Sequence, residues 1–472
     1  MRPARLASAL FVLALLAAAA PAAAQPRWLR LSYLGDDATG LGLTWNTLGP
    51  RRPAAAQVLY GLAPGRYERR AQGSLRTLGG PFGVQSEVAL RRLRPDTTYY
   101  YRVGDAQGGW SAEQRLRSRP AAGDLCTPFR FAIGGDGRAD RWEAARGTSQ
   151  RWLGVLERIR GDGARFVVHT GDFVTDGKVP AQWAAFFAAT ERFSASLPVM
   201  YALGNHDDGP GVGPGMYFSK LLQQPAAACA APGQPLEECH AFEVGPVLFA
   251  AVSTLTSSAQ GDMPFGNQAR WLDGVLAASR ARWKVVYTHY PSYTRAGFFG
   301  HPPNEQGQNA AFVAVFNARA VDLVVAGHNH FYERFAPSRC ADPGSAEPCP
   351  VAAGAPGTVY VTTGGGGAQA LPFAGSTDAT RPAASTEHHY LRVDVSATRL
   401  TLEAVAADGR ILDRHTLHKP DAAIACATAP APLPRPLPPP PPSAHARLLL
   451  LAAGASALLL TTALLWRRRR RG

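Results

Sequence analysis

Hydrophobic positions along the chain follow different patterns on the two sides of residue 120. Before it, short segments rich in β-branched and aromatic residues are separated by turn residues, as at 40–45, 56–60 and 97–103. A Pro-Asp turn signal stands directly before the third segment, as expected where a turn leads into a half-buried strand. Several short strands in about 95 residues predict an all-β sandwich over residues 25–120.

After Phe129, hydrophobic runs alternate with segments of helical periodicity. Residues 142–160 and 267–282 carry apolar side chains at helical spacing. Strands that alternate with helices predict an α/β domain, which we place at residues 126–426. Residues 427–443 are almost all Ala, Pro and Leu and predict a semi-rigid linker that packs no core.

Both ends of the chain carry apolar segments of the kind that direct export and membrane insertion. Two arginines, an apolar run and a set of small residues give positions 1–24 the build of a signal peptide, with a buried N-terminal helix as the alternative. Residues 448–466 carry no charge and are long enough to span a bilayer, and the basic residues 467–472 would form a cytoplasmic tail. We therefore expect an exported, periplasmic or cell-surface protein with a C-terminal transmembrane anchor, or with a sorting tail that is later removed.

The net charge of +14 is concentrated at the ends of the chain. Without the eight arginines at positions 2, 5, 447 and 467–471, the net charge falls from +14 to +6. Nucleic-acid binding usually needs Lys and Arg clustered on one face, and the exported part has no basic run. This pattern argues against nucleic acid as the main partner.

All six cysteines lie in the part predicted to be exported, which fits an oxidising compartment. Cys229 and Cys239 flank one short loop, and Cys340 and Cys349 flank another. Spacing alone does not fix the connectivity, and metal binding by these cysteines is the alternative, although no Cys-x-x-Cys pair occurs. From their positions near the two ends of the α/β domain, we predict a disulfide between Cys126 and Cys426.

Five hydrophobic runs of the α/β region end in side chains that can bind metal ions. These runs and their polar residues are 131–133 with Asp136, 166–168 with Asp172, 199–203 with Asn205 and His206, 285–287 with His289, and 323–325 with His328 and His330. Sites in α/β sheets form beyond the carboxyl ends of strands. Carboxylate and imidazole ligands suit first-row ions such as Fe, Mn and Zn.

Each motif also has a structural explanation when taken alone. Asp136 and Asp172 follow glycines, as turn residues often do, and the sequence Gly-Asn-His-Asp at 204–207 could be a polar loop. A lone histidine is commonly a hydrogen-bonded core residue. The His-x-His pair of His328 and His330 is more specific, because both imidazoles can point to one side. The joint occurrence of all five motifs favours a metal site.

The order Gly-Asp, Gly-Asp, Gly-Asn-His-Asp, His, Gly-His-x-His resembles the calcineurin-like metallophosphoesterase superfamily. The sequence Gly-His-Asn-His-Phe-Tyr-Glu-Arg at 327–334 and the fibronectin type III-like domain before it resemble purple acid phosphatases. The resemblance covers about residues 28–417. It implies an α/β fold in which a metallophosphoesterase β-sandwich is flanked by helices and preceded by an all-β, fibronectin type III-like domain.

The resemblance also implies the roles of the candidate ligands. Asp172 would bridge two metal ions, Asp136 and His330 would complete one site, and Asn205, His289 and His328 would complete the other. A bridging carboxylate can hold two ions about 3.5–4 Å apart with room for a water. That water would lose a proton and attack phosphorus as a metal-bound hydroxide. The implied activity is hydrolysis of phosphate monoesters, as in an acid phosphatase.

Four further residues are candidates for catalysis. In the resembling family, the position of His206 contacts the substrate and assists the leaving group, which suits an imidazole. Asp207 is its neighbour and is a candidate to orient it. His301 lies in the loop after His289, where the family carries histidines, although a solvated loop histidine is the alternative. Arg138 suits bidentate contact with phosphate, with an exposed loop arginine as the alternative.

The chain departs from purple acid phosphatases at two positions. Thr175 stands where the family has the tyrosine whose charge transfer to ferric iron gives the purple colour, and Arg138 replaces a glycine. The loss of an anionic ligand favours two divalent ions. Two other functions stay open: a phosphodiesterase or nucleotidase on the same two-metal core, and a surface adhesion or scaffold protein with an inactive phosphatase domain.

Overall fold

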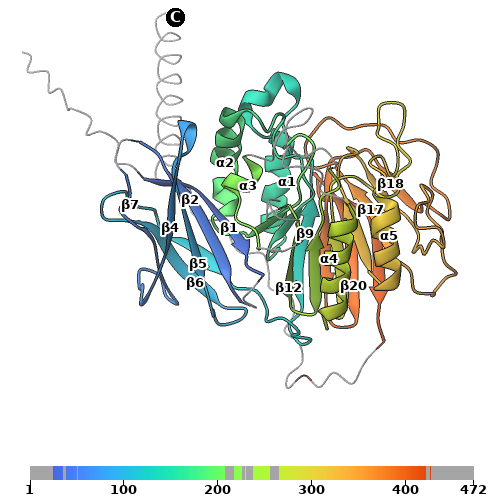
Figure 1. The fold of residues 1–472 in the computed structure, drawn as a ribbon, viewed down its shortest axis with the longest axis horizontal. Coiled ribbons are helices and arrows are strands. Elements are labelled where there is room, and N and C mark those ends of the chain that lie inside the picture. Colours follow the sequence, from blue (N-terminus) through green and yellow to red (C-terminus); the bar gives the residue numbers. More distant parts are fainter. Residues whose placement is uncertain are drawn as a thin grey trace, which may run out of the picture.

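The computed structural model has an N-terminal all-β domain and a larger α/β domain, which lie side by side (Figure 1). It describes residues 25–35, 39–49, 52–207, 217–225, 229, 238–255, 265–420 and 426. The predicted signal peptide, linker, transmembrane helix and basic tail lie outside these residues, at 1–24, 427–443, 448–466 and 467–472. Of the helices in the described part, none is long and apolar enough to cross a bilayer.

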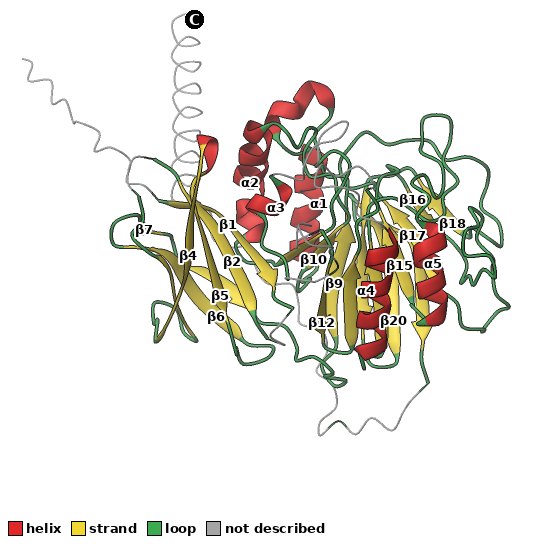
Figure 2. Ribbon diagram, in the orientation of Figure 1, coloured by secondary structure: helices red, strands yellow, loops and turns green. Residues whose placement is uncertain are grey.

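The N-terminal domain is a sandwich of antiparallel strands with one 3-10 turn, η1 (Gly80–Phe82), as Figure 2 shows. Its strands are β1 (Pro26–Tyr33), β2 (Leu41–Thr47), β3 (Ala56–Gly61), β4 (Arg69–Gly79), β5 (Gly83–Leu90), β6 (Thr98–Asp105), β7 (Gly109–Trp110) and β8 (Gln114–Arg117). The long strand β4 joins the two layers, because its first half pairs with β3 and its second half with β5. The three strands predicted from the sequence are confirmed as β2, β3 and β6.

The α/β domain contains two mixed sheets that pack face to face. In spatial order, the first is β11 (Val199–Tyr201), β10 (Val167–His169), β9 (Phe129–Gly134), β19 (His389–Val395), β20 (Arg399–Ala406) and β21 (Ile411–His418). The second is β12 (His240–Val244), β13 (Val247–Ala251), β14 (Trp283–Tyr287), β15 (Leu323–Ala326), β17 (Val359–Thr363), β16 (Tyr332–Arg334) and β18 (Ala383–Ser385). Buried side chains from both sheets, such as Phe131, Phe249 and Val325, form the core between them.

Helices cover the outer faces of this pair of sheets. Helices α1 (Gln150–Gly161) and α2 (Pro180–Ser194) pack on the first sheet, where Trp152 and Phe193 join the buried cluster of β9 and β10. On the second sheet lie α4 (Phe265–Ala278) and α5 (Asn309–Ala318), side by side in Figure 1. The short helix α3 (Phe218–Leu221) packs near α2. The predicted β-sandwich flanked by helices is therefore confirmed.

The helix predicted over residues 142–160 begins later than its pattern indicated. A 3-10 helix, η2 (Arg141–Arg146), ends at Gly147, whose φ of 72° lies in the left-handed region. Helix α1 then starts after Ser149, whose hydroxyl accepts a hydrogen bond from the backbone N–H of Arg151 at 3.0 Å. The glycine and the N-cap serine interrupt a periodicity that continues across both helices.

The two domains form a continuous packed interface. The Ser194 hydroxyl of α2 donates to the carbonyl of Leu29 in β1 at 2.7 Å, and the Tyr101 hydroxyl of β6 donates to the carbonyl of Ala195 at 2.5 Å. The rings of Tyr33 and Phe166 meet edge to face across the interface, with centroids 5.2 Å apart. The N-terminal domain therefore packs against α2 and against β11, the edge strand of the first sheet.

Three disulfides join all six cysteines: Cys126–Cys426, Cys229–Cys239 and Cys340–Cys349. The first confirms the predicted link between the two ends of the α/β domain, and the other two close the short loops noted in the sequence. Since the cysteines are paired, metal binding by them is the wrong alternative.

Candidate metal centre

The six candidate ligands lie at one end of the two sheets, beyond the carboxyl ends of five strands. Asp136 follows β9, Asp172 follows β10 and Asn205 follows β11, and these three strands run parallel. On the other sheet His289 follows β14, and both His328 and His330 follow the parallel strand β15. Because both sheets present the same ends here, the structure brings together all six residues that the sequence analysis selected.

Two glycines allow the ligand loops to approach one another closely. A Cβ atom on Gly204 would stand 2.3 Å from the Oδ1 atom of Asp172, and one on Gly327 would stand 2.5 Å from the Oδ2 atom of Asp136. Real Cβ atoms essentially never make contacts this short. The glycine before each ligand motif is therefore a requirement of close backbone packing as well as a turn signal.

Three candidate ligands have strained backbones. Asp136, Asp172 and His328 have φ angles of 56°, 61° and 69°, in the left-handed region that non-glycine residues rarely adopt. Such conformations cost free energy and cluster at functional sites, where the surrounding structure holds them in place. Here they belong to the loops that follow β9 and β10 of the first sheet and β15 of the second.

Asn205, His289 and His328 form one cluster, which we call the amide-side cluster. The Oδ1 atom of Asn205 lies 2.9 Å from Nε2 of His289 and 3.0 Å from Nδ1 of His328, and these two nitrogens are 3.2 Å apart. The Oδ1 atom of Asp172 lies 3.3 Å from Nε2 of His289. Four donor atoms of the kinds that bind first-row ions therefore surround one point.

Asp136 and His330 form the second cluster, the carboxylate-side cluster. The Oδ1 atom of Asp136 lies 3.6 Å from Nε2 of His330. Ligand atoms of Asp136, Asp172 and His289 all lie within 4.8 Å of one another, which places Asp172 between the two clusters. A carboxylate in this position can reach an ion in each cluster.

Hydrogen bonds of the non-ligating nitrogens orient the three imidazoles. The Nδ1 atom of His289 lies 2.8 Å from the carbonyl oxygen of Thr170, and Nδ1 of His330 lies 2.8 Å from that of Gln369. In His328 the roles are reversed, since Nδ1 faces Asn205 and Nε2 lies 3.1 Å from a carboxylate oxygen of Glu305. Each ring therefore donates a proton outward and presents a lone pair to its cluster, the arrangement found in metal-binding histidines.

The electrostatics of the site also suit metal binding. Burial lowers the pKa of His328 and of His330 to about 3, so both rings are neutral at physiological pH. Burial and the neighbouring charge of Asp172 raise the pKa of Asp136 well above its usual value. Burial alone would raise the pKa of Asp172, but the imidazoles of His289 and His206 and the guanidinium of Arg138 hold it below its usual range. Buried acids and neutral imidazoles at one point fit two cations, which would offset the clustered negative charge.

The structure gives His206 and Asp207 separate positions. Nδ1 of His206 lies 2.7 Å from the carbonyl oxygen of Thr175, and Nε2 lies 4.0 Å from Oδ2 of Asp172. The carboxylate of Asp207 instead accepts backbone N–H groups of Asp172, Phe173 and Gly204 at 2.7–3.0 Å. The prediction that Asp207 orients His206 is therefore wrong: a backbone carbonyl orients the imidazole, and Asp207 ties two ligand loops together.

Arg138 lies against the proposed bridging aspartate. Its Nε atom is 3.5 Å from Oδ2 of Asp172, and about 13% of its side chain is exposed, so the exposed-loop interpretation does not describe it. Within the described residues its buried Nε has no hydrogen-bond partner. The hydroxyl of Thr175 donates to the carbonyl of Ala139 at 2.6 Å, which directs its proton into the loop.

His301 lies beside the amide-side cluster. Its ring centroid is 3.8 Å from that of His328, and its Nδ1 lies 3.2 Å from a carboxylate oxygen of Glu305. Asn329 holds the loop in place, since its Oδ1 accepts the backbone N–H of His301 at 2.9 Å and its Nδ2 donates to the His301 carbonyl at 3.0 Å. The structure therefore brings His301 to the site and gives the middle residue of the His-x-His motif a supporting function.

The sequence analysis missed Glu305. It stands four residues after His301 in a segment without hydrophobic periodicity, and this spacing was its one available signal. The backbone carbonyls of Thr170, Thr175 and Gln369 had no sequence signal, because any residue supplies a carbonyl. These contacts depend on how the loops fold over the strand ends.

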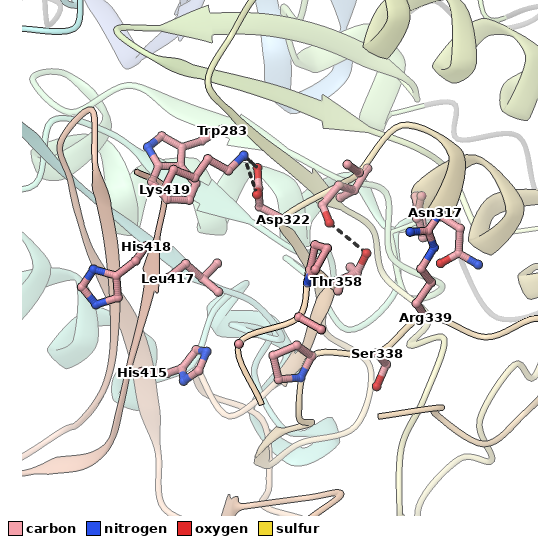
Figure 3. Close-up of a pocket in the computed structure, with 18 of the residues that line it drawn as sticks. Trp283, Asn317, Asp322, Ser338, Arg339, Thr358, His415, Leu417, His418 and Lys419 are labelled. Atoms are coloured by element: carbon pink, nitrogen blue, oxygen red, sulfur yellow. Dashed lines mark hydrogen bonds and ion pairs between the residues drawn. The ribbon is translucent and has the colours of Figure 1, made fainter. Parts of the chain in front are cut away.

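A cavity of about 520 Å³ lies at the opposite end of the sheets. Trp283, Asp322 and Thr358 line it where β14, β15 and β17 begin, and His415 and Lys419 come from the end of β21 (Figure 3). Lys419 pairs with Asp322 at 2.6 Å, and its ammonium lies 4.7 Å from the centre of the Trp283 ring. The strand ends at this cavity are the opposite ones from those that carry the candidate ligands.

Comparison with protein families gives two matches. Residues 121–332 match the family model of calcineurin-like phosphoesterases, and residues 26–118 match that of the purple acid phosphatase N-terminal domain. The first match contains all six candidate ligands: Asp136, Asp172, Asn205, His289, His328 and His330. The resemblance of the sequence motifs to these families is confirmed.

Similar proteins include enzymes of plants and mammals. The human protein named acid phosphatase type 7 is 28% identical over 431 residues, which cover 84% of this chain and 91% of that protein. Purple acid phosphatase 18 of Arabidopsis thaliana is 26% identical over 353 residues, or 72% of this chain and 71% of the relative. A solved structure of a purple acid phosphatase from yellow lupin (Lupinus luteus) seeds has a TM-score of 0.69 at 21% identity and covers 87% of this chain and 77% of its own. That last likeness shows a shared fold.

Proposed function

We propose that this chain, which carries a calcineurin-like phosphoesterase domain and a purple acid phosphatase N-terminal domain, hydrolyses phosphate monoesters outside the cytoplasm. The domains and their relatives establish a metal-dependent phosphatase with a fold that implies a dinuclear metal centre. One observation carries the proposal: six ligands from five strand ends form two adjacent clusters around Asp172, with their imidazoles already oriented.

The residues would divide the ligand functions between two ions. Asn205, His289 and His328 would hold one ion, Asp136 and His330 the other, and Asp172 would contact both. When bound, such ions supply a water of lowered pKa as nucleophile and stabilise the charges on the attacking and leaving oxygens. The donor set suits Fe, Mn or Zn.

Arg138 would bind the phosphate group. Its guanidinium carries hydrogen-bond donors on one edge, and its buried Nε has no hydrogen-bond partner among the described residues. The 3.5 Å separation from Asp172 places this cation at the centre. Planar bidentate contact with phosphate oxygens would orient the ester and balance part of its negative charge.

His206 would deliver a proton to the leaving group. Its Nδ1–H group donates to the Thr175 carbonyl, which leaves Nε2 to carry the transferred proton. The side chain is about 20% exposed, so a substrate can reach it. An imidazole in this position protonates the leaving-group oxygen as the ester bond breaks. His301, in the loop after His289, would contact the same substrate.

The location outside the cytoplasm rests on separate observations. Three disulfides fit an oxidising compartment. The apolar residues 448–466 remain the predicted membrane anchor, and they lie outside the described part of the chain. Fractionation of cells that express the full chain tests the anchor, since the protein should stay with membranes until the segment is deleted.

A pair of model substrates tests the proposed reaction. After reconstitution with Mn or Zn, the protein should hydrolyse p-nitrophenyl phosphate faster than bis(p-nitrophenyl) phosphate, because one ester group leaves the phosphate oxygens free for Arg138 and the two metal positions. Faster hydrolysis of the bis ester would contradict the monoesterase assignment and identify a diesterase. No hydrolysis of either ester by the metal-loaded protein would contradict a phosphatase and favour a binding function.

A further inference from the structure

Glu305 differs from every other group that orients a histidine of the site. His289, His330 and His206 are oriented by the backbone carbonyls of Thr170, Gln369 and Thr175. His328 instead meets the side-chain carboxylate of Glu305, at 3.1 Å from its Nε2. A charged acceptor makes the imidazole a stronger base than a neutral carbonyl does, and it strengthens the bond from the opposite nitrogen to a metal.

The loop of Glu305 is built to hold this carboxylate still. Asn304, with a φ of 53°, accepts the backbone N–H of Asn309 at the start of α5 through its side chain at 2.8 Å. The backbone N–H of Asn304 donates to the carbonyl of Pro291, two residues after His289. Glu305 is thus fixed between the start of a helix and the loop of a ligand. About 26% of its side chain is exposed.

The same carboxylate contacts His301, so it links a ligand to a residue on the substrate side. Nδ1 of His301 lies 3.2 Å from Oε2 of Glu305, which also meets His328. One negative charge therefore serves two imidazoles.

We propose that Glu305 is a positioning residue that directs the Nδ1 lone pair of His328 toward the amide-side cluster and thereby strengthens the binding of the metal ion there. This inference rests on the proposed two-metal function. It applies to one half of the centre, because the carboxylate-side cluster has its histidine oriented by the carbonyl of Gln369. Loss of Glu305 should therefore weaken the binding of the ion at the amide-side cluster and leave the binding of the ion at the carboxylate-side cluster unchanged.

The test measures metal content and affinity, independently of activity. In Glu305→Ala, the affinity for the ion at the amide-side cluster should fall by about 10- to 100-fold, as measured by competition with a chelator. Elemental analysis after dialysis should then give one ion per chain in place of two. Glu305→Gln keeps a hydrogen-bond acceptor without the charge, so the loss of metal affinity in this variant should be smaller than in Glu305→Ala. Glu68→Ala removes an exposed glutamate of the N-terminal domain and should behave as wild type.

The outcomes separate this inference from the proposed function. Two ions bound with wild-type affinity by Glu305→Ala would overturn the positioning role and leave the two-metal centre intact. Three ions bound per wild-type chain would also overturn the positioning role, because Glu305 would then be a metal ligand together with His301 and His328. A wild-type protein that binds no ions would contradict the proposed function itself. Melting temperatures of the metal-free variants should match wild type, which excludes a folding defect.

Discussion

The two ends of the α/β domain use charged residues in opposite ways. At the carboxyl ends of the strands, Asp136 and Asp172 are buried together, and their loops hold strained backbones. At the other end, Asp322 is paired with Lys419, and a cavity of about 520 Å³ opens beside them. The first end gathers like charges that require cations, whereas the second satisfies its charges internally.

The presence of a cavity does not by itself identify the functional site. The cavity at the second end is lined partly by apolar and proline residues, and its ion pair is complete without a ligand. The first end has donor atoms that converge and hydrogen bonds that orient them. Substitutions at the first end should therefore change catalysis, and those at the second end should change stability.

The largest effect is expected for Asp172→Ala. The change removes the proposed bridge between the clusters. Loss of a group that is only hydrogen-bonded to a metal ligand lowers activity by up to roughly 100-fold, so the rate of phosphate release should fall by more than that. Asp322→Ala is the matched control at the opposite end, with lower stability and unchanged turnover of the folded enzyme. Steady-state kinetics with circular dichroism would decide. Near wild-type activity in Asp172→Ala would remove the basis of the comparison.

His206→Ala should give the next largest effect. Loss of the proton donor should lower kcat by about 100-fold or more, while metal content stays at the wild-type level, because His206 is not among the proposed ligands. His418→Ala, which changes a histidine that lines the cavity at the other end, is the control with unchanged kcat. Loss of metal from His206→Ala would show that this residue is a ligand.

The disulfide Cys126–Cys426 should act on stability alone. It closes a loop of 300 residues, so replacement of both cysteines by serine should lower the free energy of unfolding by up to about 5 kcal/mol. The Cys340–Cys349 bridge spans 9 residues, and the same replacement there should cost less than about 3 kcal/mol. Urea denaturation measures both. An equal loss in the two double variants would contradict the loop-closure explanation.

Lys419→Met should give a smaller loss of stability. The variant keeps a long apolar side chain over Trp283 but leaves Asp322 without its cation, at a cost of about 1–2 kcal/mol because Lys419 is partly exposed. Burial raises the pKa of Asp322, so the cost should be largest at neutral pH and shrink as the carboxyl group gains a proton in acid. Thermal unfolding at several pH values measures this trend. A change in kcat would show that the two ends are coupled.

The smallest change, a spectroscopic one, concerns Thr175. A threonine hydroxyl has no phenolate orbital for charge transfer, so active, iron-loaded, oxidised enzyme should lack a strong visible band. The hydroxyl is bonded to the Ala139 carbonyl, which agrees with this expectation. If a purple band appears, Tyr290 is the residue to change to phenylalanine, because its ring centroid lies 4.0 Å from that of His328. The band itself would contradict the Thr175 argument, and its loss in Tyr290→Phe would identify Tyr290 as the source.

The fold was predictable because local patterns and global architecture agree. Alternation at 56–60 and 97–103 became β3 and β6, and the helical pattern at 267–282 became α4. The start of α1 was misplaced because Gly147 and Ser149 interrupt a periodicity that continues on both sides. A single left-handed residue leaves little trace in a hydrophobic pattern.

The candidate ligands were predictable, but the residues that orient them were not. Each ligand follows a hydrophobic run, so the strand ends revealed Asp172 and His289 by their place in the chain. Asp207 was expected to orient His206, yet its carboxylate accepts backbone N–H groups instead. Glu305 reaches the centre because the loop after β14 folds back toward β15. Contacts of this kind depend on tertiary structure, which adjacency in sequence does not report.

The central claim is that two metal ions at the carboxyl ends of the strands carry the phosphatase activity. The most direct test is one titration that follows phosphate release against the number of ions bound per chain, starting from chelated protein. The account predicts no hydrolysis without metal and full activity as the ratio reaches two. Full activity at a ratio of zero, or at one with no further change, would contradict it.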